Sequence, residues 1–174
     1  EAPDAPAPAF ARTLVEMFRR GTVGGGRFGL HRGTGRNFRA TVEGLARGAE
    51  VFCASQLSAG NGNAMLIAPV AWYFRDDPAR LATTVVQVAR VKQRDVRGIA
   101  AAAAAAWVVR HGLLEGGFAR FDADALLAFV RGAEDEAASQ AGDRSHIRTF
   151  SGALGAMLER REDPRELVLS AIAE

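Results

Sequence analysis

The sequence predicts an all-α fold, on three observations. No segment alternates apolar and polar residues between turn signals, which is the pattern of a half-buried strand. Apolar residues instead recur every three or four positions, as on one face of a helix. Two aspartate–proline pairs, Asp77-Pro78 and Asp163-Pro164, combine a helix N-cap with a proline suited to the first helical turn. We therefore predict helices joined by loops.

The first predicted helix begins at Phe10 and ends at Gly21. Its apolar face carries Phe10, Leu14, Met17 and Phe18. We interpret the proline- and alanine-rich residues 1–9 as a linker or frayed terminus, and residues 10–174 as one helical domain, which we expect to be incomplete. A second, short helix is predicted with Gly48 just beyond its end and three residues facing inward: Phe38, Val42 and Leu45.

Residues 65–74 are predicted to form a buried helix, with Pro69 tolerated in its first turn. Three aspartates are predicted to cap the helices that follow: Asp77, Asp95 and Asp122. The helix capped by Asp95 should end at His111-Gly112, and its alanine run at 100–106 lets neighbouring helices approach closely. Two more helices are predicted, one with Ile147, Phe150, Leu154, Met157 and Leu158 on its apolar positions and a last one after Asp163-Pro164.

The composition is that of a globular protein. Its 174 residues are 48% hydrophobic and 24% charged, and the net charge of +2 demands neither a nucleic acid nor a membrane. Cys53 is the only cysteine, which excludes an intrachain disulfide and favours a reducing compartment. No apolar run approaches the roughly 18–20 residues of a membrane span and no signal peptide is visible, so we predict a cytoplasmic location. Because the sequence does not begin with methionine, we expect a fragment or a processed product.

The segment from Ser58 to Met65 is the strongest candidate for a binding loop. Glycines at positions 60 and 62 tolerate unusual φ values and leave backbone N–H groups accessible. A helix is predicted to begin directly afterwards, so free N–H groups and the helix dipole would both favour an anion. Ser58 and Asn61 add side-chain donors suited to a ribose or a diphosphate. The residues alone favour an ordinary capped turn over a binding loop, because Asn and Gly are common turn residues.

The run from Gly60 to Pro69, GNGNAMLIAP, resembles the signature G-N-G-x-A-M-R-x-A-P of the ADP-ribosylglycohydrolase family. Softer similarities follow at Asp77-Pro78, in Ala89–Ala101 against the family's A-R-x-T-H-x-D-P segment, and in the tail from Ser151 to Ile172. The resemblance covers about residues 10–174. It implies an orthogonal multi-helix bundle, of which this chain would be a part.

The resemblance also implies a function. Members of the family cleave the bond between ADP-ribose and a protein side chain or small molecule, with two Mg²⁺ ions held by aspartates. The implied partner is ADP-ribose or an ADP-ribosylated protein, with neither a membrane nor a nucleic acid. Six residues are implied as ligand-binding candidates: Ser58, Gly60, Asn61, Gly62, Met65 and Asp95.

The departures from the family pattern concern catalysis. The metal motifs T-D-D-T and G-D-A-x-G should precede this sequence and G-G-D-x-D-T should follow it, so we assign no catalytic and no metal-ligating residue here. The family's Thr-His pair is Lys92-Gln93, and its arginine after the methionine is Leu66. We expect this chain alone to be inactive. Two hypotheses stay open: a piece of a longer magnesium-dependent hydrolase, or a catalytically inactive relative that binds ADP-ribose or a partner protein.

Other polar groups give weaker indications. The glycine-rich loop carries Arg27, His31, Arg32, Arg36 and Arg39, which could bind phosphates or RNA, although a solvated loop explains them as well. In the family a glycine loop here approaches the adenosine, so Gly33 and Gly35 are further candidates. The three histidines, His31, His111 and His146, lack metal-ligand spacing, and we attribute His111 to the dipole at a helix C-terminus. The run Glu134-Asp135-Glu136 is interpreted as a solvated face.

Overall fold

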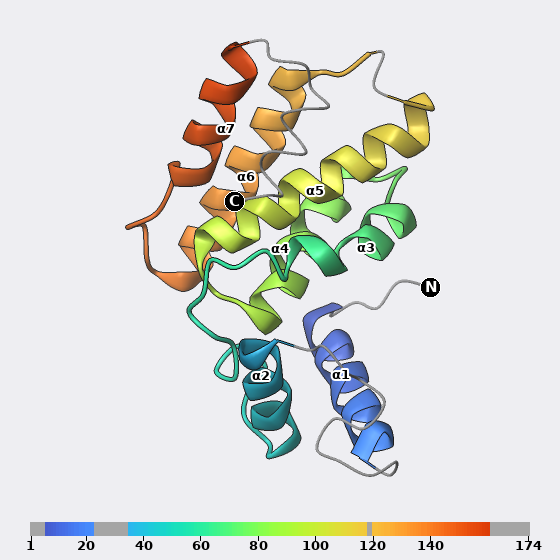
Figure 1. The fold of residues 1–174 in the computed structure, drawn as a ribbon, viewed down its shortest axis with the longest axis vertical. Coiled ribbons are helices and arrows are strands. Elements are labelled where there is room, and N and C mark those ends of the chain that lie inside the picture. Colours follow the sequence, from blue (N-terminus) through green and yellow to red (C-terminus); the bar gives the residue numbers. More distant parts are fainter. Residues whose placement is uncertain (1–5, 23–34, 118–119, 161–174) are drawn as a thin grey trace.

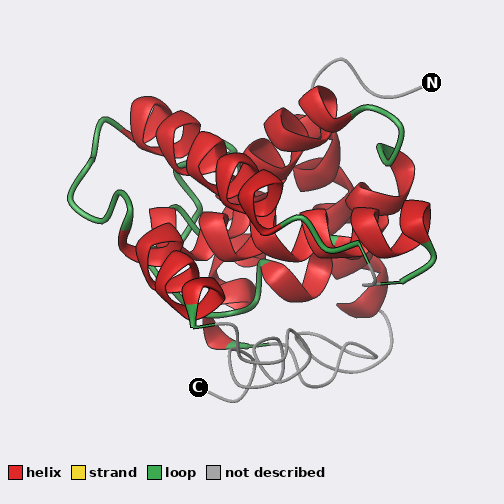
Figure 2. Ribbon diagram, turned by 90° about the horizontal axis from the view of Figure 1, so that it is seen from above, coloured by secondary structure: helices red, strands yellow, loops and turns green. Residues whose placement is uncertain are grey.

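A computed structural model describes residues 6–22, 35–117 and 120–160 of the chain. These residues form α-helices, one short 3-10 helix and connecting loops, with no strand among them (Figure 1, Figure 2). The elements are α1 (Pro6–Thr22), α2 (Arg36–Ala46), η1 (Ala64–Leu66), α3 (Ala68–Tyr73), α4 (Pro78–Lys92), α5 (Val96–Glu115), α6 (Ala123–Ala141) and α7 (Thr149–Glu159). The predicted all-α fold class is confirmed.

The long helix α5 lies at the centre and packs against α3, α4, α6 and α7 (Figure 1). Its alanine run explains this position, because small side chains let several helices come close at once. Four of these alanines are completely buried: Ala100, Ala102, Ala103 and Ala106. The main core joins the last three to Ile67, Leu81, Val85 and Ile99, whereas Ala100 belongs to a separate cluster with Trp107. The run is a packing surface, as predicted.

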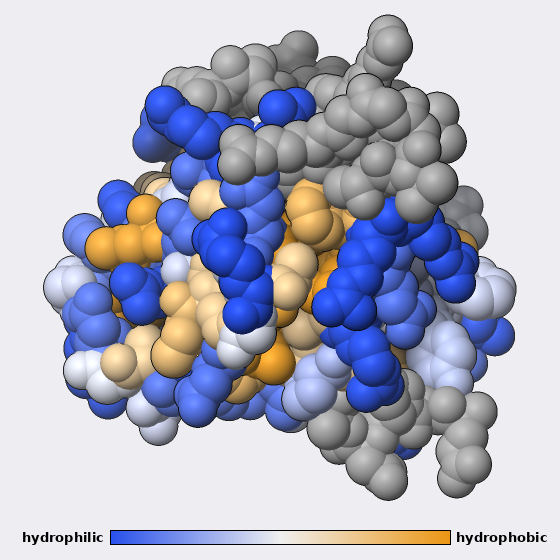
Figure 3. Space-filling model, turned by 90° about the horizontal axis from the view of Figure 1, so that it is seen from below, coloured by the Kyte–Doolittle hydropathy of each residue, from blue (hydrophilic) through white to orange (hydrophobic). Residues whose placement is uncertain are grey.

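The helices α1 and α2 pack beside the end of α4 and form a second cluster with it. Its buried members include Ala7, Ala11, Leu14, Val42, Leu45 and Val91. Residues 6–9 are helical and Ala7 is buried, so interpreting residues 6–9 as linker was wrong; α1 also runs one residue past Gly21. The surface of the molecule seen from below shows apolar side chains between rows of polar side chains (Figure 3).

The predicted N-caps are confirmed. The carboxylates of three aspartates each accept a hydrogen bond of 2.9 Å from a backbone N–H in the first turn: Asp77 from Arg80, Asp95 from Arg97 and Asp122 from Ala125. The end of α5 was predicted wrongly, because the helix continues to Glu115 and stops at Gly116, which has a φ of +66°. His111 therefore lies before the last turn, buried and stacked on Trp107 with ring centroids 4.9 Å apart, so that aromatic packing rather than the helix dipole accounts for it.

Residues 64–74 do not form one buried helix. A 3-10 turn, η1, is followed by the short helix α3, and Pro69 stands in the first turn of α3 as predicted. Ile67 and Ala71 are completely buried, whereas Trp72 is 58% exposed. Buried and exposed residues alternate here because only one face of this short segment packs against α4 and α5.

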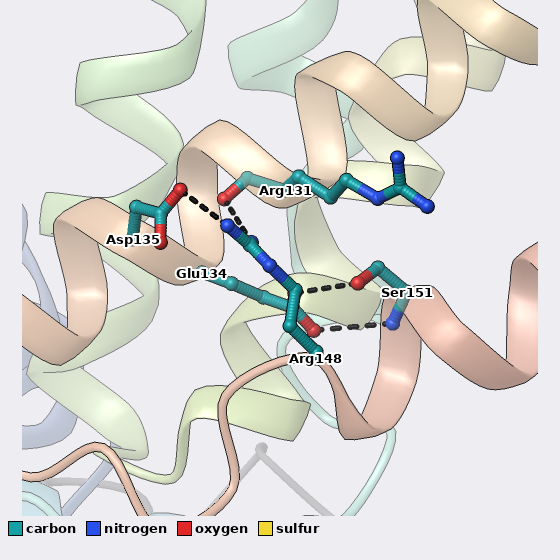
Figure 4. A network of polar contacts seen from close by, with 5 residues as sticks. All are labelled: Arg131, Glu134, Asp135, Arg148 and Ser151. Atoms are coloured by element: carbon teal, nitrogen blue, oxygen red, sulfur yellow. Dashed lines mark hydrogen bonds and ion pairs between the residues drawn. The ribbon is translucent and has the colours of Figure 1, made fainter.

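A buried carboxylate joins α6 to α7 (Figure 4). Glu134 is completely buried and accepts hydrogen bonds from the Ser151 backbone N–H at 3.1 Å and the Ser151 hydroxyl at 2.7 Å. The Arg148 guanidinium lies 3.3 Å from Glu134 and 2.7 Å from the Asp135 carboxylate. The prediction that residues 134–136 form a solvated face was thus wrong for Glu134. The helical period of about 3.6 places Glu134 on the buried face of α6 with Val130 and Ala137, while Asp135 is exposed.

Some predictions fall outside the described residues. These are the last helix after Asp163-Pro164 and, in the glycine-rich loop, Arg27, His31, Arg32 and Gly33. Arg36 and Arg39 belong to α2, where both are exposed. Among the helices of the described ranges, none combines the length and apolar character that crossing a bilayer requires.

Candidate functional site

The loop between α2 and η1 is anchored to the turn between α4 and α5. The Gln56 backbone N–H donates to the Lys92 carbonyl at 3.1 Å, and the Arg94 N–H donates to the Gln56 carbonyl at 3.1 Å. These bonds form an isolated parallel bridge between Gln56 and Gln93. The bridge fixes the start of the loop beside the first turn of α5.

Ser58 is held from two directions. The Gln93 side-chain amide donates to the Ser58 hydroxyl oxygen at 3.2 Å, and the Gly60 backbone N–H donates to the same oxygen at 3.3 Å. Gln93 is 3% exposed, so the anchor is inside the protein, whereas Gly60 is exposed. The Ser58 hydroxyl accepts both bonds and keeps its own proton to donate.

The glycines of this loop leave space for the side chains of Gln93 and Lys92. Neither Gly60 nor Gly62 has a positive φ, contrary to the expected use of unusual backbone angles. A Cβ atom at Gly60 would lie 3.4 Å from the Gln93 amide nitrogen, and one at Gly62 would collide with the Lys92 ammonium. From the opposite side, Gly98 in the first turn of α5 leaves room for the Ser58 carbonyl, which a Cβ there would meet at 3.3 Å.

Asn63 fixes the far end of the loop. Its side chain is completely buried, and its amide donates to the Ala89 carbonyl of α4 at 3.2 Å. Its Oδ1 and the Oε1 of Gln93 are buried acceptors without a hydrogen-bond partner among the described residues. The element after Asn63 is the three-residue η1, too short for the α-helix dipole on which the predicted anion site depended.

The outer side of the loop is open to solvent. Asn61 is exposed, and Met65 is 77% exposed. The Met65 N–H donates to the Asn61 carbonyl at 3.2 Å, which leaves the Asn61 side chain outside the turn's own backbone bonding. Leu66 is half-buried and packs against the main core, so the family's arginine position here serves packing.

Lys92, the last residue of α4, extends beneath this turn. Its ammonium lies against Gly62 and 5.4 Å from the centroid of the Phe38 ring in α2. Burial lowers the pKa of Lys92, and no carboxylate among the described residues offsets that effect. The loop therefore has a partly desolvated cation at its base.

The sequence profile described as ADP-ribosylglycohydrolase matches residues 1–174. The chain belongs to the ADP-ribosylglycohydrolase family. No curated protein and no solved structure matches it.

The described part of this ADP-ribosylglycohydrolase family member does not fit a two-magnesium site. Within it, no group of three or more His, Cys, Asp or Glu side chains is placed to hold a metal ion. Asp95, the carboxylate among the predicted ligand residues, is buried and already hydrogen-bonded: Arg97 donates to it from Nε at 3.0 Å, Nη2 at 2.8 Å and the backbone at 2.9 Å. The hydrogen bonds from Arg97 lower the pKa of Asp95.

The structure brings the predicted ligand residues of the ADP-ribosylglycohydrolase signature into one turn. Ser58, Gly60, Asn61 and Gly62 share the loop, and Met65 follows in η1, while Asp95 lies at the start of α5 and binds Arg97. The sequence did not predict the four residues that contact the loop from its inner side: Gln93, Lys92, Gly98 and Asn63. Two signals were available, the departure from Thr-His at Lys92-Gln93 and a glycine early in a helix, where its low propensity suggests close packing.

Proposed function

We propose that the loop from Ser58 to Met65 binds the ADP-ribose portion of the family's ADP-ribosylated substrates. The observation that carries this proposal is the asymmetry of the loop. Its inner side is tied to α4 and α5 through Gln93 and Asn63, while Gly60, Asn61 and Met65 face solvent. A loop supported in this way can present polar groups without reorganising on binding, which reduces the entropic cost of recognition.

Each ligand candidate has a role that its chemistry suits. The Asn61 amide, which can donate and accept, and the Ser58 hydroxyl, which keeps its proton to donate, would bind ribose hydroxyls. The backbone of Gly60 and Gly62 would approach the diphosphate closely, because no side chain intervenes. Met65 would give an apolar contact. Asp95 would act as a positioning residue through Arg97 and the first turn of α5.

The reaction class of the family is hydrolysis of the bond that attaches ADP-ribose to another group. Magnesium would supply charge stabilisation and a bound water for that reaction. A second function, ADP-ribose recognition without catalysis, is favoured by one observation: both oxygens of Asp95 accept hydrogen bonds from Arg97, whose positive charge would also oppose a metal cation there. We therefore propose binding as the role of this portion of the protein.

Calorimetric titration of ADP-ribose into the wild type, Asn61→Ala and Asn37→Ala tests the loop. Asn37 is an exposed asparagine of α2, so it controls for the same chemical change outside the loop. We expect Asn61→Ala to weaken binding by about tenfold, the loss of one or two hydrogen bonds, and Asn37→Ala to leave it unchanged. Equal affinities of all three proteins, or no heat from the wild type, would remove the assigned role.

A hydrolysis assay separates the two functions. An ADP-ribosylated peptide is incubated with the protein in the presence and absence of added MgCl₂, and released ADP-ribose is quantified. Release that depends on magnesium would establish a hydrolase. Binding without release would establish the recognition function.

A further inference from the structure

Lys92 is fixed at its backbone and directed toward the loop. Its carbonyl accepts hydrogen bonds from the Gln56 N–H at 3.1 Å and the Thr41 hydroxyl at 3.3 Å. With the main chain held between α2 and the loop, the side chain passes the ring of Phe38 and ends at Gly62. The position of the ammonium is thus set by three separate parts of the fold.

The charge of Lys92 is not neutralised by the described residues. The aliphatic stem is half-buried, and burial shifts the pKa of the amine downward without a nearby carboxylate to counter it. A cation removed from water without a counter-ion loses solvation free energy that an anionic ligand would restore. An anion should therefore gain more binding free energy from this half-buried lysine than from a fully solvated one.

Gly62 and Lys92 are sterically matched. A Cβ at position 62 would occupy the space that the ammonium takes, so any other residue would push Lys92 away from the turn. The exposed residues Gly60 and Asn61 stand directly before Gly62. The ammonium consequently lies at the base of the same turn whose backbone is proposed to approach the ligand's diphosphate.

We infer that Lys92 is a specificity-determining residue of this site, a cation that pairs with the diphosphate of the bound ligand through the opening left by Gly62. The inference rests on the proposed ADP-ribose loop and adds to it a charge requirement. Ligands that carry a diphosphate should be bound in preference to neutral nucleosides, and a lysine–phosphate pair is a strong, charge-assisted contact.

Lys92 is the only lysine of the chain, which makes a direct observation possible. Reductive methylation with ¹³C-formaldehyde labels this amine and the chain's α-amine and preserves both positive charges. Titration with inorganic diphosphate should shift the Lys92 methyl signal in a saturable manner and leave the α-amine signal as an internal reference. No saturable shift at Lys92 would overturn the inference in the wild-type protein, whatever the stability of any variant.

Lys92→Met removes the charge but keeps most of the stem, and Arg131→Gln removes one positive charge from an exposed position of α6. We expect Lys92→Met to weaken ADP-ribose and inorganic diphosphate by about tenfold or more, the scale of a lost charge-assisted hydrogen bond. Adenosine affinity should stay within about twofold, and Arg131→Gln should bind all three as the wild type does. Equal weakening of diphosphate by both variants would contradict a local role.

A double-mutant cycle tests the match with Gly62. Gly62→Ala should weaken diphosphate binding in the wild type and have much less effect in Lys92→Met, because the ammonium that it displaces is already absent. Equal effects in both backgrounds would contradict the inference. Failure of the inference is distinguishable from failure of the proposed loop: ADP-ribose would then still bind in an Asn61-dependent manner without a response at Lys92.

Discussion

The Gln93 amide donates a hydrogen bond of 3.2 Å to the Ser58 hydroxyl, across the junction of α4 and α5 with the loop. Gln93 follows the last residue of α4 and is nearly inaccessible to solvent, whereas Ser58 is half-exposed. The bond therefore fixes the position of a solvent-facing turn relative to two packed helices. Because Ser58 also binds the Gly60 N–H, one side chain orders three residues of the loop.

Gln93→Ala should loosen the loop and weaken ADP-ribose binding more than it weakens the fold. One neutral hydrogen bond contributes about 0.5–1.5 kcal/mol, so we expect up to about a tenfold loss of affinity. The measurement is calorimetric titration beside a thermal melt. Gln87→Ala, which replaces a half-buried glutamine of α4, is the matched control and should keep the wild-type affinity. A melting temperature that falls while affinity holds would make Gln93 purely structural.

Gly98→Ala and Gly132→Ala should differ in sign, although both replace a glycine inside a long helix. Alanine normally gains about 1 kcal/mol of helix propensity over glycine. At Gly132 a Cβ meets nothing within 4 Å, so that gain should appear as higher stability. At Gly98 the Cβ would press on the Ser58 carbonyl at 3.3 Å, which should outweigh the gain, lower the stability and displace the loop. Urea denaturation measures the stability of both variants. Equal stabilisation would show that the loop moves aside without a measurable cost in free energy.

The helices were predictable where a local signal was strong. Aspartate N-caps at 77, 95 and 122 depend on a few neighbouring residues, and all three were found. The end of α5 was missed because Gly112 continues the helix and Gly116 stops it, a choice that local sequence does not decide. The burial of Glu134 was missed because its partner, Ser151, lies 17 residues further on.

The loop itself was predictable, but its physical basis was not. The glycines at 60 and 62 are visible in the sequence, and the expected reason was backbone freedom. The structure gives another reason, the nearness of Gln93 and Lys92, which are about 30 residues away in the chain. Contacts of that range are invisible to periodicity and turn rules, since those rules describe neighbours in sequence.

Ser151→Ala should destabilise the fold by about 1.5–3 kcal/mol, because its hydroxyl bonds a completely buried carboxylate at 2.7 Å and hydrogen bonds to charged groups are strong. Ser139→Ala is the matched control, an exposed serine of α6 that should change stability by less than about 0.5 kcal/mol. Urea denaturation followed by circular dichroism compares the two. Similar midpoints would show that Arg148 and the Ser151 backbone N–H are sufficient to stabilise the buried Glu134 carboxylate.

Asp95→Asn should make stability less dependent on acid pH. Arg97 lowers the pKa of Asp95 in the folded protein below its ordinary value of 3.8. A lowered folded pKa means that the ionised group stabilises the fold above the unfolded pKa and that this stabilisation disappears as the pH falls through the folded pKa. The wild type should thus be more stable than Asp95→Asn at pH 7, because asparagine can replace the N-cap oxygen but not the negative charge that pairs with Arg97, and the difference should shrink below about pH 4.

The control for this pH dependence is Asp124→Asn, which removes an exposed carboxylate from the first turn of α6. It subtracts the general effect of one negative charge near a helix N-terminus, so what remains for Asp95 is the ion pair with Arg97. Urea denaturation of the three proteins at pH 7, 5 and 3 gives the comparison. If Asp95→Asn and Asp124→Asn followed the same pH profile, the ion pair between Asp95 and Arg97 would contribute nothing to stability beyond the interaction with the helix dipole. Arg97 would then not hold the Asp95 carboxylate away from a metal.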